Sequence, residues 1–301
     1  MDQAETLRDI KRRTTGTDSG NLAKGKKEKG RNSDIRVIAV TSGKGGVGKT
    51  NIAANISYAL SMRGKKTLLL DADTGLANVD VILGITPTYN LCHILAGEKT
   101  VAETIVKGPG GMMILPASSG IQEMVEMSRG QKLTLLDMLE DFDEKLDFML
   151  IDTGAGIAGN VMFFNMCASE IIVFVSPEPT SLTDAYALIK VLYKSQEAKR
   201  FMILVNMAQD AGEASAVYRR LSKAVEHFLE LSVEYIGFIP FDESVRQVIK
   251  KQHLLMEVFP SSKASLHIAK IAELLSRQKT TTCNPGTIKF FNRAVINNYD
   301  R

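Results

Sequence analysis

Four glycines and two lysines crowd into residues 43–50, GKGGVGKT, directly after an apolar run. Glycine lets the backbone turn so that successive amide groups point inward, an arrangement that binds phosphate oxygens. In the pattern G-x-x-x-x-G-K-[ST], Lys49 would reach the β- and γ-phosphates and the Thr50 hydroxyl would bind Mg²⁺. The start of the following helix adds a favourable dipole. We predict a nucleotide-binding phosphate loop made of Gly43, Lys44, Gly45, Gly46, Val47, Gly48, Lys49, Thr50 and Asn51.

Three carboxylates follow two further apolar runs. Asp71 and Asp73 lie two positions apart after KTLLL, so in an extended chain they point the same way. One could hold a magnesium-bound water, and the other could orient the water that attacks the phosphate. Asp152 ends FMLID, as expected of a carboxylate that touches Mg²⁺ through water. Gly154 would leave room for the γ-phosphate. The alternatives are an Asx turn at residue 71 and a solvent-exposed strand-end aspartate at residue 152.

A later strand end, LVNMAQD, offers an amide for the nucleotide base. Asn206 could read a base edge, but a guanine reader of the N-K-x-D type would need an aspartate at position 209, where Gln209 stands. Adenine is therefore favoured, although Asn206 could equally be a strand-end turn residue. We also expect the backbone of Pro240, Phe241 and Asp242 to pack against the base.

Strand and helix patterns alternate along the body of the chain. Continuous apolar runs at 35–41, 66–71, 112–117, 147–152, 170–176, 200–206 and 234–240 are typical of strands buried on both faces. Helical spacing occurs at 50–64, 129–142, 181–196, 213–230 and 263–276. This alternation predicts an α/β fold with a doubly wound, mostly parallel sheet. Ligands bind such sheets beyond the carboxyl ends of the strands, where every motif above falls.

The two ends of the chain differ from the body in charge. The whole chain carries +3, but residues 1–33 and 277–301 each carry +4, which leaves −5 for the body. An acidic body argues against a DNA-coating surface, whereas basic tails suit an anionic partner or membrane; the alternative is that the tails only keep the chain soluble. We expect an N-terminal segment at 1–13 with a short helix at 2–13, a flexible linker at 14–33, an ATPase domain at 34–276 and a tail at 277–301.

Cysteine usage and hydropathy indicate a cytoplasmic protein. Cys92, Cys167 and Cys283 are scattered, and no C-x-x-C occurs, so we expect neither a disulfide framework nor a zinc or iron–sulfur site. We also expect no membrane-spanning helix, because no apolar stretch approaches 18 residues, and the first residues lack the apolar block of a secretory signal.

With these motifs the chain resembles a known family, the MinD/ParA ATPases, within the wider SIMIBI class of P-loop proteins. The segment KGGVGKT is similar to that family's deviant phosphate loop, and the resemblance covers roughly residues 35–276. It implies that Lys44 crosses to the nucleotide of a partner subunit, so that ATP joins two subunits into a homodimer. It also implies that Asp73 positions the attacking water and that Asp152 is the magnesium-side carboxylate.

Two segments, DADTGLANVDVILG and IDTGAGI, are similar to the family's flagellar-number regulators (FlhG, also called FleN or YlxH). MinD usually has proline where Gly154 stands, and Thr74 departs from the usual apolar residue. The start DQAETLR resembles the segment that activates the GTPase FlhF, in which a glutamine, here Gln3, reaches the partner's GTP site. The resemblance implies a partner-activating set of Asp2, Gln3, Ala4, Leu7 and Arg8. The alternative is a frayed polar terminus.

The far end suggests a membrane-targeting helix at about 286–299. Helical winding gathers an apolar face, with Lys289 and Arg293 opposite, as in helices that lie in a membrane interface. The expected membrane residues are Ile288, Phe290, Phe291 and Val295. The family has a comparable tail, and two such anchors on one dimer would bind together. Alternatively this segment packs on the body.

These observations predict an ATP-hydrolysing switch that uses ATP/ADP and Mg²⁺. As a dimer it would bind the inner face of the cell membrane and an FlhF-type GTPase. A flagellar transcription regulator and basal-body C-ring proteins are further candidate partners, and nucleic acid is not expected. The alternatives are a MinD- or ParA-like positioning ATPase for cell division or chromosomes, and a non-catalytic nucleotide-binding interaction module.

Overall fold

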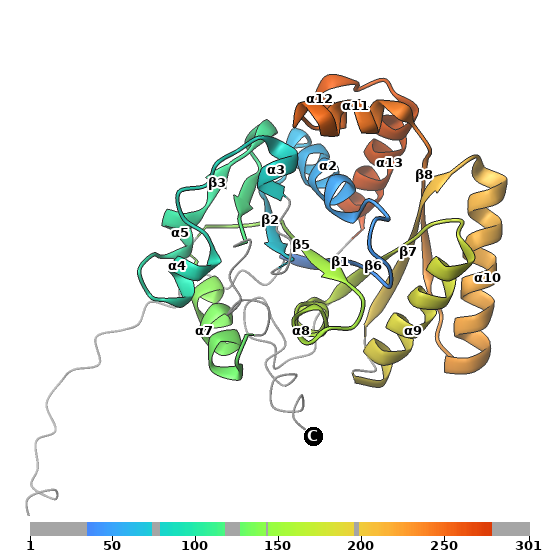
Figure 1. Ribbon diagram of the computed structural model, residues 1–301, viewed down its shortest axis with the longest axis horizontal. Helices are drawn as coiled ribbons and strands as arrows, with labels where there is room; N and C mark the ends of the chain where they lie inside the picture. Colours follow the sequence, from blue (N-terminus) through green and yellow to red (C-terminus); the bar gives the residue numbers. More distant parts are fainter. Residues whose placement is uncertain (1–34, 74–78, 118–126, 143, 196–198, 279–301) are drawn as a thin grey trace, which may run out of the picture. The chain divides into compact units, whose positions relative to one another are not determined.

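The computed structural model describes residues 35–73, 79–117, 127–142, 144–195 and 199–278, which are drawn in colour in Figure 1. The predicted segment 1–13, the linker 14–33 and the tail helix at 286–299 lie outside these residues. Within the described residues, no helix combines the length and the apolar character needed to traverse a bilayer.

Eight strands form one sheet in the order β3-β4-β2-β5-β1-β6-β7-β8. Neighbouring strands are parallel, except that β3 runs antiparallel to β4. The strands are β1 (Arg36–Ser42), β2 (Thr67–Ala72), β3 (Val106–Lys107), β4 (Met113–Leu115), β5 (Phe148–Ala155), β6 (Glu170–Val175), β7 (Arg200–Ala208) and β8 (Glu234–Pro240). The predicted α/β class with a mostly parallel sheet is confirmed.

The central parts of the inner strands are apolar because both faces of the sheet are covered. Along β1, Val37 and Ala39 belong to one hydrophobic core, while Ile38 and Val40 belong to the other. Side chains alternate between faces along a strand, so a strand with two buried faces has no polar period. The unbroken apolar runs in the sequence follow from this arrangement.

Two layers of helices cover the sheet (Figure 1). One core takes in residues of α4 (Leu91–Leu95), α5 (Val101–Thr104), α7 (Arg129–Glu140), α8 (Gly159–Cys167), α9 (Pro179–Ser195) and α10 (Ala211–Leu229). The other takes in residues of α2 (Lys49–Met62), α3 (Val79–Leu83), α11 (Glu243–Lys251), α12 (Leu255–Val258) and α13 (Lys263–Arg277). A short 3₁₀ turn, η1 (Pro109–Gly111), precedes β4. Helices on both faces make the fold doubly wound.

Several helices begin at residues suited to that position. Ser128 and Gln131 form a capping box at the start of α7, and the side chains of Asp210 and Ser262 accept backbone hydrogen bonds at the starts of α10 and α13. Pro179 is the first residue of α9, where its missing N–H has no helical partner to lose. These residues fix where each helix leaves the carboxyl edge of the sheet.

The order of the strands changes direction at β1, which makes its carboxyl end a topological switch point of the sheet. This strand pairs with β5 on one side and β6 on the other, while β2 lies beyond β5. The carboxyl end of β1 is therefore next to that of β5, one strand away from that of β2. Open α/β sheets bind their ligands at such a point, and here the loop that follows β1 is the predicted phosphate loop.

Candidate active site

The phosphate loop bridges β1 and α2, as the sequence predicts. Gly46 and Gly48 have φ angles of 79° and 84°, which side chains with a β-carbon rarely adopt. At Gly43 the reason is space, since a β-carbon there would lie 2.2 Å from the backbone carbonyl carbon of Asp184 on α9. At Gly48 a β-carbon would lie 2.6 Å from Nδ2 of Asn206. Conformation therefore favours glycine at residues 46 and 48, and packing favours it at residues 43 and 48.

Lys49, the first residue of α2, lies withdrawn from water beside two carboxylates. Its side chain is buried, and burial lowers its pKa, while the charges of Asp152 and Asp73 act in the opposite direction. A cation held among carboxylates at the start of a helix is suited to meet the negative charge of a phosphate group.

Asp152 is fully buried and lies on β5, between the neighbouring strands β1 and β2. Its register partners are Val40 of β1 and Asp71 of β2. Burial raises the pKa of its carboxyl to about 7, whereas the Thr50 hydroxyl and Lys49 lower it and Asp73 raises it. Among the described residues, neither Asp152 oxygen has a hydrogen-bond partner of good geometry. A buried carboxylate left in this state is costly, so a bound cation or its water ligands would satisfy it.

The two carboxylates after β2 differ in their surroundings. Asp71 is buried, and its oxygens accept from the backbone N–H groups of Asp73 and Val79, each at 3.2 Å. Asp73 is partly exposed, and its Oδ1 lies 3.4 Å from the position of a β-carbon on Gly154. Asp71 therefore holds the chain on both sides of residues 74–78, which lie outside the described residues. Both carboxylates were expected to face the phosphates. The Asp71 oxygens are bound to backbone N–H groups, so the partly exposed Asp73 is the better placed of the two.

Lys44 points to α9 rather than into its own loop. Its ammonium forms an ion pair with Glu178 and lies 3.4 Å from the Thr180 hydroxyl. The side chain is 40% exposed. Lys44 is therefore separate from the cluster of Lys49, Asp73 and Asp152. This position agrees with a role outside its own phosphate site, and the predicted role at a partner's nucleotide stays a prediction.

The predicted base-binding residues lie at the ends of β7 and β8, but two of their side chains are already engaged. The buried Asn206 donates from Nδ2 to the Val47 carbonyl at 2.7 Å. The Asp242 carboxylate accepts from the backbone N–H groups of Ser244 and Ala264, so it joins the starts of α11 and α13. Pro240 is buried and Phe241 is 41% exposed. Base contact by these residues stays a prediction.

Sequence reasoning missed the residues in α9 and just before it that contact the loop. Glu178 holds Lys44, and the backbone of Asp184 lies against Gly43. The segment SPEP follows β6, the strand beside β1, so its place at the carboxyl edge was a usable signal for Glu178. Asp184 gave no such signal, because only the packing of α9 brings its backbone to the loop. The partner-activating and membrane residues predicted at 2–8 and 288–295 lie outside the described residues.

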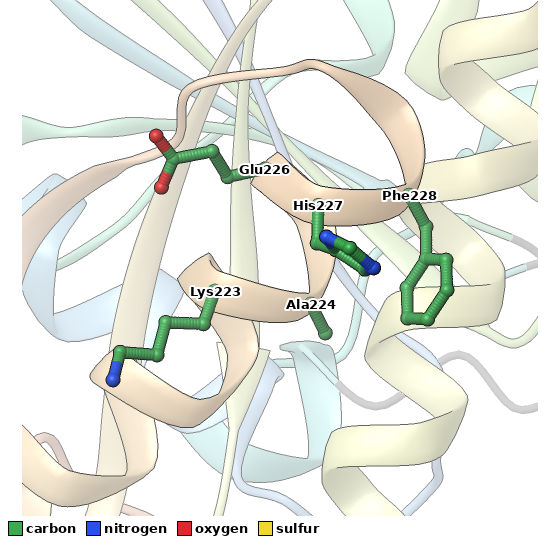
Figure 2. A pocket seen from close by; sticks show the side chains of 5 residues that line it. All are labelled: Lys223, Ala224, Glu226, His227 and Phe228. Carbon is green, nitrogen blue, oxygen red and sulfur yellow. The ribbon is translucent and has the colours of Figure 1, made fainter.

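A surface hollow on α10 is separate from this site. Figure 2 shows the five side chains that line it, all from that helix: Lys223, Ala224, Glu226, His227 and Phe228. The Phe228 ring packs edge-on against Tyr186 of α9, with 6.2 Å between ring centroids. None of these residues belongs to the phosphate loop or to the strand ends around it, so the hollow contributes nothing to phosphate binding.

Comparisons with known proteins agree with this geometry. A family model described as "AAA domain" matches residues 35–204. The chain is 42% identical over 270 residues to the antiactivator FleN of Pseudomonas aeruginosa, covering 90% of this chain and 96% of FleN. It is 33% identical over 267 residues to the flagellum site-determining protein YlxH of Helicobacter pylori, covering 87% and 90% of the two chains.

A solved structure shares the fold. The septum site-determining protein MinD of Pyrococcus horikoshii, complexed with Mg-ADP, superposes with a TM-score of 0.68 at 26% identity. The match covers 81% of this chain and 96% of MinD. Together with the phosphate loop and its carboxylates, these findings show that the chain belongs to the MinD/ParA-type ATPases, in the group that includes FleN and YlxH.

Proposed function

We propose that this protein is an ATP-driven dimer switch that controls the number and placement of flagella. The observation that carries the catalytic part is the cluster of Lys49, Asp152 and Asp73 beside the phosphate loop. In this proposal Lys49 binds the phosphates. Asp73, partly exposed and next to Gly154, holds the attacking water in line.

The residues around Asp152 fit a magnesium ion. Carboxylate and hydroxyl oxygens suit this hard cation, and the two Asp152 oxygens lack hydrogen-bond partners of good geometry among the described residues. Thr50 and Asp152 would hold the ion, partly through water. Asp71 would act from farther away, by fixing the chain after β2. When bound, the ion neutralises charge on the phosphates.

The position of Lys44 supports a role for a dimer. Lys44 is partly exposed and paired with a carboxylate at the surface, so leaving that pair costs little free energy. In an ATP-bound homodimer its ammonium would stabilise charge that develops on the partner's triphosphate. A single subunit would then hydrolyse ATP slowly, and hydrolysis would dissolve the dimer.

The flagellar assignment rests on the group to which the chain belongs. FleN is described as an antiactivator and YlxH as a flagellum site-determining protein. By extension, residues 2–8 would stimulate an FlhF-type GTPase, with Gln3 as the residue that reaches its active site. A flagellar transcription regulator and C-ring proteins would be further partners. The tail at 286–299 would bring the ATP dimer to the inner membrane surface.

Molecular mass and phosphate release would test the switch. We expect the full-length chain to be a monomer with Mg-ADP and a dimer with Mg-ATP. Lys44→Ala should bind ATP yet remain a monomer, and Asp73→Ala should form the dimer without releasing phosphate. A wild-type mass that is unchanged by ATP would refute the switch.

The partner activities need their own measurements. Removing residues 2–8 should abolish stimulation of the GTPase while leaving ATP turnover unchanged. Binding to vesicles of anionic lipid should rise with ATP and disappear when residues 286–299 are deleted. If wild-type turnover is negligible and Asp73→Ala still activates the GTPase, the chain is instead a non-catalytic interaction module.

A further inference from the structure

Met207 has a backbone conformation that its place in the fold does not explain. Among the described residues, three that are not glycine have positive φ angles: Met207 at 61°, Glu230 at 53° and Gln252 at 58°. Glu230 and Gln252 end α10 and α11, where a left-handed residue is common. Met207 lies within β7, where an ordinary strand residue would be extended. Such outliers persist only where the surroundings enforce them, and they cluster at functional sites.

The surroundings of Met207 lock the strained residue on both sides. Asn206 pairs with Ile239 of β8 and Ala208 pairs with Pro240, so Met207 is skipped in the register. The Asn206 side chain is bound to the phosphate loop, and the Ala208 carbonyl accepts from the Phe241 N–H at 2.9 Å. Asn206 and Ala208 are buried, whereas Met207 is 41% exposed. The bulge thus turns one apolar side chain outward between two fixed neighbours.

The Met207 side chain lies against the phosphate loop. Its Cε is 3.6 Å from the position that a β-carbon on Gly48 would occupy, and Gly48 is the last residue before α2. The adjacent strand β8 ends beside it, followed by Phe241, which is also 41% exposed. Met207 and Phe241 are therefore two exposed apolar side chains at the carboxyl ends of neighbouring strands, at the edge of the sheet where the nucleotide would lie.

We infer that Met207 binds the face of the nucleotide's purine ring. This inference rests on the proposed ATP-binding function and deepens it. A thioether is polarisable and packs well against an aromatic ring. It recognises the flat face and not the hydrogen-bonding edge of a base. Met207 therefore adds affinity for a purine nucleotide over a ligand that has phosphates but no base.

Calorimetry with two ligands tests this inference on the full-length chain. Mg-ADP carries the base, and Mg-pyrophosphate carries only phosphates. Met207→Gly removes the thioether and accepts a positive φ, so we expect it to fold. Contacts between sulfur and an aromatic ring are worth about 0.3–1.5 kcal/mol, so ADP should bind about two- to tenfold more weakly. Pyrophosphate should bind as tightly as it does to the wild type.

Two further variants separate the thioether from backbone strain. Glu230→Gly relieves a positive φ at the exposed end of α10, so it should leave both affinities unchanged. Met207→Asn also tolerates a left-handed backbone and lacks the thioether, so it should repeat the selective loss. Equal weakening of both ligands by either Met207 variant, or no weakening of ADP, would overturn the inference. If the wild type binds neither ligand, the proposed function itself fails.

Discussion

Gly43 offers a direct test of how α9 supports the phosphate loop. In Gly43→Ala the new β-carbon would lie 2.2 Å from the carbonyl carbon, 2.3 Å from the carbonyl oxygen and 2.6 Å from Cβ of Asp184. Two of these atoms are backbone, so the overlap cannot be relieved by turning a side chain. Either α9 or the loop must move. Overpacking of this kind costs about 1–3 kcal/mol, which for a domain of this size lowers Tm by about 2–12 °C.

Gly45→Ala is the matched control for this change. A β-carbon at Gly45 meets nothing within 4 Å, and its φ is not in the left-handed region, so stability should change by less than about 0.5 kcal/mol. Thermal unfolding without nucleotide measures both variants, and calorimetry with Mg-ADP shows whether the loop still binds. Adding Asp184→Ala to Gly43→Ala should restore nothing, because alanine keeps the backbone and Cβ that cause the overlap. Equal unfolding temperatures for the two glycine variants would refute the reasoning.

Three further predictions follow from buried groups. Burial raises the pKa of Asp152 from 3.8 to about 7, so the folded chain keeps a proton that the unfolded chain loses, and stability without nucleotide should fall as pH rises from about 4 to 7. Urea unfolding across that range should show a smaller fall in Asp152→Asn; an identical fall contradicts this origin. Glu170→Gln leaves Arg36 buried without its counterion and should cost about 3–5 kcal/mol in urea unfolding, whereas Glu273→Gln, in a more exposed pair, should cost less than about 1 kcal/mol. Asn206→Ala removes a hydrogen bond to the loop, so ADP and pyrophosphate should both bind about fivefold more weakly; a loss confined to ADP would contradict this and indicate that Asn206 acts on the base.

Most of the sheet could be predicted because most of its strands are buried on both faces. All seven predicted strands are present, with ends that differ by no more than three residues. The strand β3 was missed because it has two residues and pairs only with β4 at the sheet edge. The helix α8 was missed for a different reason: residues 160–167 are all buried, so it has no polar face and no helical period in the sequence.

The site was predictable where its chemistry lies within one segment, and not where it depends on packing. The loop at 43–50, Asp73 and Asp152 could be chosen because each follows an apolar strand in a recognisable spacing. The contact of Gly43 with α9 and the bulge at Met207 depend on how distant segments meet. The amide of Asn206 contacts the loop backbone, a contact that the spacing of the sequence cannot show.

The opposite edge of the sheet ties the two ends of the described body together. At the amino ends of the strands, hydrogen bonds link the charged side chains of Arg36, Glu170, Arg200 and Glu234, and Gln278 after α13 donates to Glu234. Arg36, at the start of β1, also donates to the carbonyls at the end of α13, so the N-terminal and C-terminal ends of the described body lie together there. The helix α13 starts at the other edge, where Asp242 binds the N–H of Ala264. Both β1 and α13 thus run from one edge of the sheet to the other, so each element connects the edge beside the phosphate loop to the edge where Arg36 and Glu170 pair.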